Sequence, residues 1–256
     1  NKELLEIEVP YNEAIDPASV EEAFRKRPDI KIVTVVHHDT PSGTINPVKE
    51  IGAIVRRHDA LMLVDAVSSF GGMEILREDC QANAFVTGPG KCLGGPPGLT
   101  LVAMSERAWR HIEANPKAPF ASVLSLKDWK EAWRHDRPFP FTPSVSDMNG
   151  LDGALDQYLD EGPETVWARH ALTARACRAG IQAMGLQLWA ASEAIASPTC
   201  TAVRLPKGVE DKALLAAARA GYGVVFSSGA LRQVGHRADV AAGLTAAMDV
   251  IAAARG

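Results

Sequence analysis

The sequence predicts an α/β protein in which helices flank a mostly parallel sheet and a smaller α+β domain follows. The first observation is a strand–helix–strand succession between residues 31 and 65. The second is a pair of short apolar runs, at 84–86 and 99–103, that add two strands to the same sheet. The third is a return to alternating strands and helices from residue 199 onward. Together these patterns are typical of a large α/β domain followed by a small one.

The first unit is set by side-chain shape and spacing. Residues 31–36 form a β-branched run, which is typical of a buried strand. Residues 47–58 place apolar side chains at helical spacing behind a proline in the first turn, and 60–65 are a second apolar strand. Such a unit implies parallel strands joined by a right-handed crossover. Residues 4–9 also alternate as a strand would.

The second half predicts more helices and less sheet. The alternating prolines of 138–143 exclude both a helix and a central strand. We expect helices over 106–113, 126–135, 163–184 and 212–220, strands over 201–205 and 224–226, and an alanine-rich helix from Val240. We therefore divide the chain into a large domain, residues 1–160, and a small C-terminal domain, residues 161–256.

Composition excludes several classes of protein. The 256 residues are 46% apolar and 23% charged, which is ordinary for a globular protein with a core. The net charge of −4 and the lack of a basic block argue against nucleic acid, and no apolar stretch approaches membrane-spanning length. The four cysteines are scattered without a CxxC pair, which favours a reducing cytoplasm over a disulfide framework.

Polar side chains follow three predicted strands at the points where those strands end. Residues 37–44 follow the first strand, Asp65 to Ser69 close the second, and Lys91 follows the third. Ligands of parallel α/β sheets bind outside the carboxyl ends of the strands. We expect the functional site at this rim.

Lys91 is the first candidate for chemistry. It lies in a glycine- and proline-rich loop, residues 87–98, where glycines allow a close approach of backbone to a ligand. A lysine amine with limited hydration is the group that forms a Schiff base with a carbonyl. On this segment alone, an exposed loop lysine is an equally good interpretation.

Asp65 is the second candidate. Its carboxylate emerges from a largely apolar strand, where a charge needs a partner. A protonated heteroaromatic nitrogen is one such partner, and an aspartate that caps the following turn is the alternative. An acid and a lysine on neighbouring strand ends match the pyridinium partner and Schiff-base lysine of pyridoxal chemistry, which favours the functional interpretation.

The remaining polar residues carry weaker signals. His37 and His38 are adjacent, so on a strand they point to opposite faces and cannot share a metal ion. Thr40, Ser42 and Thr44 can donate to a ligand or cap a turn, and for Ser42 and Thr44 we expect the cap. The loop around Lys91 departs from a P-loop, and no GxGxxG follows a strand.

These residues resemble a known family. The Asp65–Ser69 segment, followed by Lys91 and Gly94 to Gly98 in a Lys-x-x-Gly-x-Pro-Pro-Gly pattern, is similar to the class V, fold-type I aminotransferases. The His37–Thr40 segment is similar to that of their alanine–glyoxylate and serine–glyoxylate branch. The resemblance covers nearly the whole chain and implies a fold-type I large domain with a small C-terminal domain.

The resemblance implies a particular transamination. The amino-acid sequences of four segments, 4–16, 37–47, 91–94 and 138–143, resemble those of one branch of the family. Enzymes of that branch convert pyridoxamine and pyruvate to pyridoxal and L-alanine in bacterial vitamin B6 degradation. The vitamin is then a substrate, and no cofactor is held tightly. Lys91 would form the Schiff base with pyridoxal and shuttle the proton between C4′ and Cα.

The resemblance also assigns binding roles. Asp65 would keep the pyridine nitrogen protonated, Val67 would pack on one ring face, and Thr40 would bond near the ring oxygen. Arg232 is the candidate for the substrate carboxylate, one residue out of the family register. The family also leads us to expect chain before Asn1, near Gly229 and after His236 that this sequence does not contain.

Two other functions stay open at this point. One is a pyridoxal-phosphate-dependent alanine–glyoxylate or serine–glyoxylate aminotransferase, although Gly90 and Cys92 give a phosphate few donors. The other is a non-catalytic binding or assembly module, for which paired Asp65 and Lys91 have no use. Because fold-type I sites are generally completed across a subunit interface, we expect a homodimer or homotetramer with residues 139–143 at the contact.

Overall fold

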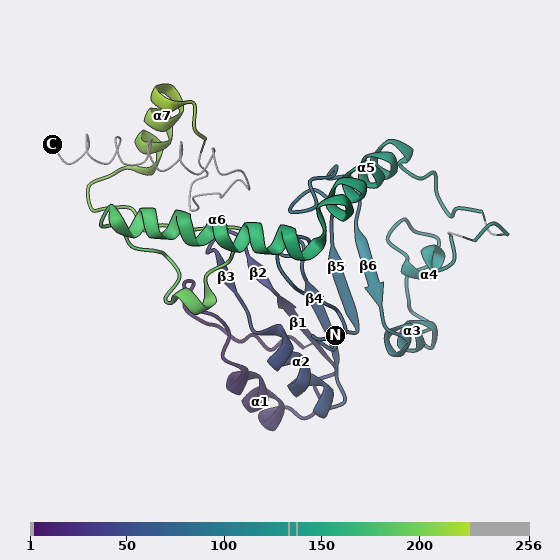
Figure 1. The fold of residues 1–256 in the computed structure, drawn as a ribbon. Helices are drawn as coiled ribbons and strands as arrows, with labels where there is room; N and C mark the ends of the chain where they lie inside the picture. The colour runs from purple at the N-terminus through teal and green to yellow at the C-terminus, as the bar shows by residue number, and fades with distance from the viewer. Residues whose placement is uncertain (1–2, 133, 137, 226–256) are drawn as a thin grey trace.

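The central sheet of the computed structural model contains four strands in the order β1-β4-β5-β6 (Figure 1). They are β1 (Ile32–Val36), β4 (Leu61–Asp65), β5 (Ala84–Thr87) and β6 (Leu101–Met104). The first three are parallel, and β6 is antiparallel to β5. The structure describes residues 3–132, 134–136 and 138–225. The predicted mostly parallel sheet is confirmed.

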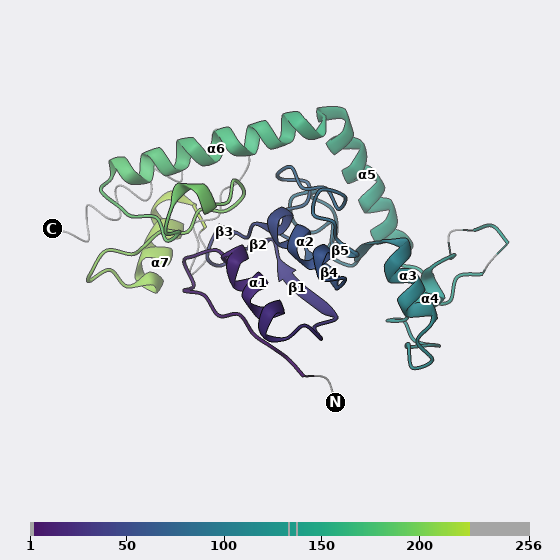
Figure 2. The ribbon, with the colours of Figure 1, turned by 90° about the horizontal axis from the view of Figure 1, so that it is seen from below.

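Two helices cover one face of this sheet. They are α1 (Pro17–Lys26) and α2 (Val48–Arg57), which lie together in front of the strands when the molecule is seen from below (Figure 2). The α1 helix begins where Asp16 accepts a hydrogen bond from the Ala18 amide, followed by proline in the first turn. The main core lies between these helices and the sheet and includes Phe24, Ile51 and Met62, each 1% exposed.

Helix α2 contacts the chain beside it at Gly52, and this contact gives a stability prediction. A Cβ atom at Gly52 would lie 1.9 Å from the Cys80 carbonyl oxygen and 3.3 Å from the Met62 sulfur. We expect Gly52→Ala to lower the free energy of unfolding by at least roughly 1–3 kcal/mol, because backbone must move to admit the methyl group. Urea unfolding followed by circular dichroism measures the change.

The matched control is a second glycine inside a helix. A Cβ atom at Gly153 would meet nothing within 4 Å. We expect Gly153→Ala to leave stability unchanged or to raise it by up to roughly 1 kcal/mol through helix propensity. Equal effects of the two substitutions would show that the Gly52 contact is not tight.

The remaining helices lead from the sheet to the C-terminal part. Long helix α6 crosses the molecule near the carboxyl ends of β1 and β4 and follows α5 directly (Figure 1). These elements are α3 (Glu106–Glu113), α4 (Leu126–Trp129), α5 (Val145–Glu161), α6 (Pro163–Ala183), the 3-10 helix η1 (Glu193–Ile195) and α7 (Asp211–Tyr222). No helix in the described part of the chain is both long and apolar enough to cross a membrane.

Three of the expected elements are wrong. Residues 4–9 form no strand, because they run beside β1 across a groove instead of pairing with it. The helix expected over 126–135 ends at Trp129, whose indole nitrogen bonds back to the Val123 carbonyl at 3.0 Å and curls the segment. Residues 201–205 form no continuous strand; Thr201 and Val203 are bridge residues, and Val203 pairs with Leu188.

Other differences concern the second half of the chain. Helix α5 is an element that the sequence did not lead us to expect. Residues 224 and 225 are not in a strand, while residue 226 and the helix expected from Val240 lie outside the described residues. The boundary expected at 160/161 falls beside Gly162, whose φ of 85° separates α5 from α6. The division into two domains stays a prediction.

Candidate active site

Three segments meet at the carboxyl edge of the sheet because β1, β4 and β5 are parallel. Val36 ends β1 opposite Asp65, and Asp65 in turn lies opposite Val86 of β5. The His37 amide donates to the Asp65 carbonyl oxygen at 2.8 Å, which ties the end of β4 to the loop after β1. The segments that carry Thr40, Asp65 and Lys91 therefore leave the sheet side by side.

Lys91 is exposed between two buried neighbours. Pro89 is fully buried and Leu93 is 6% exposed, so the backbone is anchored on both sides of the lysine. The Gly94 amide bonds to the Lys91 carbonyl at 3.0 Å, and the Gly95 amide bonds to the Pro89 carbonyl at 2.8 Å. Of the two interpretations that the sequence left open, the described chain agrees with the exposed loop lysine. The loop fixes where the amine stands and leaves it accessible.

Asp65 has one oxygen engaged and one available. Its Oδ1 accepts a hydrogen bond from the Val67 amide at 2.9 Å, so the turn-capping interpretation is confirmed. No residue of the described chain bonds to Oδ2. The carboxylate is half-buried, as is Val67. One oxygen shapes the turn that presents Val67, and the other can accept a hydrogen bond from a ligand.

Thr40 forms a hydroxyl pair with a residue that sequence reasoning missed. Its Oγ1 donates to the Ser68 hydroxyl, while its carbonyl accepts from the Cys200 thiol at 3.3 Å. Since each hydroxyl has one hydrogen, a Thr40 that donates to Ser68 leaves Ser68 as the donor toward a ligand. The position of Ser68 beside Val67 in a polar turn was a usable signal.

The expectation of a turn cap is confirmed for Ser42, whose hydroxyl oxygen accepts a hydrogen bond from the Thr44 amide at 3.3 Å. For Thr44 it stays a prediction, because the side chain of Thr44 contacts the Ser42 hydroxyl, at 2.7 Å. Both residues are buried. They shape the loop that carries Thr40 and are not exposed to a ligand.

The two histidines have different surroundings. The His38 Nδ1 atom lies 2.7 Å from the Ser68 carbonyl oxygen, whereas no hydrogen bond from the described residues reaches the His37 Nδ1. Among the described residues, no cluster of metal-ligating side chains is present. Burial, with smaller contributions from the nearby charges of His38 and Lys49, lowers the pKa of His37 to about 4.

The buried His37 predicts acid sensitivity. Because its folded pKa of about 4 lies below the ordinary histidine value of 6.5, the unfolded chain binds more protons between these two pH values. Stability is therefore fully present above about pH 6.5 and is lost as the pH falls toward 4. We expect the protonation of His37 to lower the free energy of unfolding by about 3 kcal/mol over that pH range. Urea unfolding of the wild type and of His37→Leu measures it; an identical pH dependence in the two proteins would contradict the prediction.

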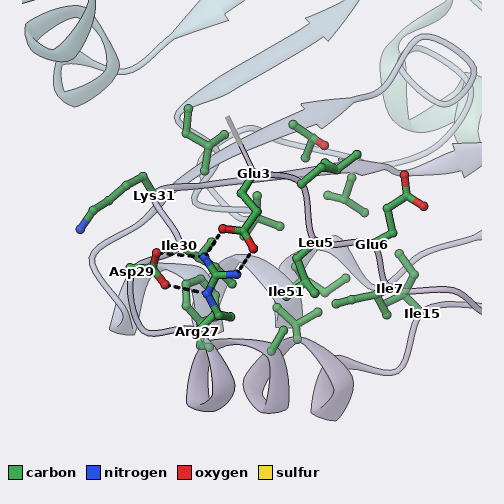
Figure 3. A pocket seen from close by; sticks show the side chains of 18 of the residues that line it. Glu3, Leu5, Glu6, Ile7, Ile15, Arg27, Asp29, Ile30, Lys31 and Ile51 are labelled. Carbon is green, nitrogen blue, oxygen red and sulfur yellow. Dashed lines mark hydrogen bonds and ion pairs between the residues drawn. The ribbon is translucent and has the colours of Figure 1, made fainter. Parts of the chain in front are cut away.

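Large hollows lie elsewhere on the molecule. A groove of about 1010 Å³ separates residues 3–8 from β1, with Arg27 bonded to both Glu3 and Asp29 beside it (Figure 3). A second hollow of about 700 Å³ lies on the sheet and is lined by residues such as Leu63 and Val86. Neither contains Lys91, Asp65, Thr40 or Val67. The candidate site is thus defined by its convergent polar groups.

The predictions for the C-terminal part of the site fall on residues that the structure does not describe. Arg232 lies outside the described residues, as do Gly229 and His236. Thr199, by contrast, is described and reaches the Ser68 carbonyl from 131 residues along the chain. Nothing in the sequence pattern signalled that contact.

The fold and the rim define a class of enzyme. Residues 2–244 match the family model of the class V aminotransferases, and the chain belongs to that family. This confirms the fold-type I architecture that the resemblance implied.

Particular relatives narrow the comparison. The chain is 65% identical over 239 residues to a pyridoxamine–pyruvate transaminase of Mesorhizobium japonicum, covering 91% of this chain and 61% of the relative. It also matches the crystal structure of pyridoxamine-pyruvate aminotransferase from Mesorhizobium loti with a TM-score of 0.94 and 60% identity, covering 98% of this chain and 67% of that one.

A more distant relative is named for the alternative reaction, the transfer of an amino group to glyoxylate. The chain is 31% identical to a serine–glyoxylate aminotransferase of Methylorubrum extorquens, over 83% of this chain and 54% of the relative. The chain thus spans just over half to two thirds of the length of these relatives.

Proposed function

We propose that this chain belongs to an enzyme that transfers the amino group of pyridoxamine to pyruvate, giving pyridoxal and L-alanine. The observation that carries the proposal is the pairing of Asp65, with a carboxylate oxygen available, and Lys91 on neighbouring strand ends. The 65% identity to a relative named for this reaction supports the choice of substrates. We place the reaction in vitamin B6 degradation.

The residues fit a pyridine ring. Asp65 Oδ2 would accept the hydrogen of the ring nitrogen, Val67 would pack on one face, and Thr40 with Ser68 would bond near the ring oxygen. When bound, the protonated ring withdraws electrons from the carbon that loses a proton. Each of these roles uses a side chain, or a hydroxyl pair, that lies at the carboxyl edge of the sheet.

Lys91 would carry the proton transfer. Its Nζ would condense with the aldehyde of pyridoxal, releasing water. The amino group of pyridoxamine would condense with the carbonyl of pyruvate, releasing water. The free Lys91 amine would then remove a proton from C4′ and deliver it to the former carbonyl carbon of pyruvate, which becomes Cα of alanine. Arg232 is our candidate ligand for the pyruvate carboxylate.

The loop around Lys91 favours an unphosphorylated substrate. Gly90 has no side chain, and Cys92 directs its thiol to the Ser68 carbonyl oxygen at 3.6 Å. Burial raises the pKa of that thiol, so it remains uncharged at neutral pH. Neither residue offers a charged donor to a phosphate. We therefore propose that pyridoxamine and pyridoxal come and go as substrates, with no tightly bound cofactor.

We also propose a homodimer or homotetramer. Apolar side chains are exposed on the segments around α4 and before α5: Phe120 (76%), Leu124 (81%), Phe139 (48%) and Phe141 (36%). A surface of this kind is typical of a protein contact. The four cysteines are free, which fits a reducing compartment such as the cytoplasm. Sedimentation of the full-length protein tests the association, and a monomer would contradict it.

The activity assay separates the three candidate functions. Full-length protein is incubated with pyridoxamine and pyruvate, without a phosphate ester, while formation of pyridoxal is followed by absorbance. We expect turnover. Activity only on alanine and glyoxylate after addition of pyridoxal phosphate would instead support the alanine–glyoxylate or serine–glyoxylate alternative. Failure of both reactions would leave a non-catalytic module.

A further inference from the structure

The carbonyl oxygen of Ser68 is a point where distant segments of the chain meet. His38 Nδ1 lies 2.7 Å from it, Thr199 Oγ1 3.4 Å and Cys92 Sγ 3.6 Å. His38 belongs to the short strand β2 (His38–Asp39) that follows β1, Thr199 to the segment after η1, and Cys92 is next to Lys91. One backbone atom therefore joins the loops of the candidate site.

The bond from His38 has a defined direction. A carbonyl oxygen only accepts hydrogen bonds, so at 2.7 Å the Nδ1 atom of His38 must carry a hydrogen. His38 is 3% exposed, and burial is the largest influence that lowers its pKa. The ring is therefore neutral with its hydrogen on Nδ1. Among the described residues, its Nε2 has no hydrogen-bond partner.

This bond fixes residues that would contact the substrate ring. Ser68 follows Val67 directly, so holding the Ser68 carbonyl also holds the peptide that presents Val67. Thr40 is two residues after His38 and bonds to the Ser68 hydroxyl. The same two segments are thus joined twice, once by the His38 side chain at the Ser68 carbonyl and once by the Thr40 hydroxyl at the Ser68 hydroxyl.

We propose that His38 is a positioning residue for the pyridine ring: its Nδ1–H holds the Ser68 carbonyl and so places Val67 and the Thr40–Ser68 hydroxyl pair. This inference rests on the proposed function, because it takes pyridoxal as the ring that occupies the site. It assigns His38 no contact with the substrate. His37 has no equivalent bond in the described part of the chain and serves as the control.

The test compares His38→Leu with His38→Asn in the full-length protein. Asparagine can place an amide N–H near the position of Nδ1, whereas leucine fills the space without a donor. We expect His38→Leu to weaken pyridoxal binding and to raise the KM for pyridoxamine by about tenfold, the usual scale for the loss of one hydrogen bond, because Thr199 and Cys92 still donate to the Ser68 carbonyl but at longer distances. The KM for pyruvate should change by less than about twofold, and His38→Asn should restore most of the loss.

Binding is measured separately from turnover. Pyridoxal is titrated by absorbance, and the adduct on Lys91 is reduced with borohydride and located by mass spectrometry. If His38→Leu does not fold, His38→Gln replaces it, because glutamine carries its amide near the position of Nε2 and leaves the Ser68 carbonyl without that donor. We expect it to behave as the leucine variant should.

Several outcomes would overturn the inference. Equal pyridoxal binding by the leucine, glutamine and asparagine variants would do so, as would equal increases in both KM values. The same selective change in His37→Leu would show a general packing effect. If the wild type binds pyridoxal while His38→Leu matches it, this inference alone fails. If the wild type neither binds pyridoxal nor turns over, the proposed function fails as well.

Discussion

Replacing Lys91 with alanine should abolish the transamination almost completely. We expect kcat to fall by roughly 10²–10⁴-fold or more, because Lys91 is the amine that follows β5, the neighbour of the strand that ends at Asp65, and it would move the proton. The loop should keep its shape, since Pro89 and Leu93, not Lys91, are its buried anchors. Initial rates with pyridoxamine and pyruvate, together with borohydride trapping of pyridoxal, measure the loss.

An exposed lysine away from the rim provides the control. Lys117 is exposed on the chain after α3 and makes no side-chain ion pair with the described residues. Lys117→Ala should retain full activity and full trapping at Lys91. Substantial turnover by Lys91→Ala, at wild-type stability, would remove this lysine from the mechanism.

Replacing Asp65 with asparagine should give the second largest effect. Asparagine keeps an oxygen that can accept from the Val67 amide, so the turn after β4 should survive. It removes the negative charge that would keep the ring nitrogen protonated. We expect kcat to fall by roughly 10²–10³-fold, the scale found for the loss of one preorganised electrostatic partner.

Stability and absorbance distinguish this effect from unfolding. Asp65→Asn should unfold in urea at nearly the same concentration as the wild type, while bound pyridoxal should show the spectrum of an unprotonated ring. Asp156→Asn, on the exposed surface of α5, should change neither property. An active Asp65→Asn enzyme with an unchanged spectrum would contradict the role of the carboxylate.

The sequence was sufficient for the parts of the fold that depend on local pattern. The β-branched run of β1, the apolar run of β4 and the proline-initiated helix α6 were all predicted, because side-chain shape and spacing act within each segment. Residues 4–9 show the limit of this reasoning. Their alternation is typical of a strand, but a strand also needs a partner edge, and the described chain offers none that pairs with them.

The candidate site likewise contains residues that local sequence could predict and residues that depend on contacts between distant segments. Asp65, Lys91 and Thr40 could be placed at one rim because parallel strands bring their carboxyl ends together. Ser68 was missed because a serine in a turn is usually only a cap, and its hydroxyl pair with Thr40 depends on the spacing of two loops. Thr199 could not have been found, because its contact with Ser68 arises only when the C-terminal segment packs against the sheet.

The Ser68 carbonyl also sets an order of events during synthesis. His38 and Cys92 can reach it as soon as the sheet has formed, but Thr199 must first emerge from the ribosome and return across 131 residues of chain. Contacts of such separation are slow to form, because a long loop must close before they stabilise anything. A nascent chain that ends before α6 therefore has its acid and its lysine in place, but the scaffold that aligns them is not yet complete.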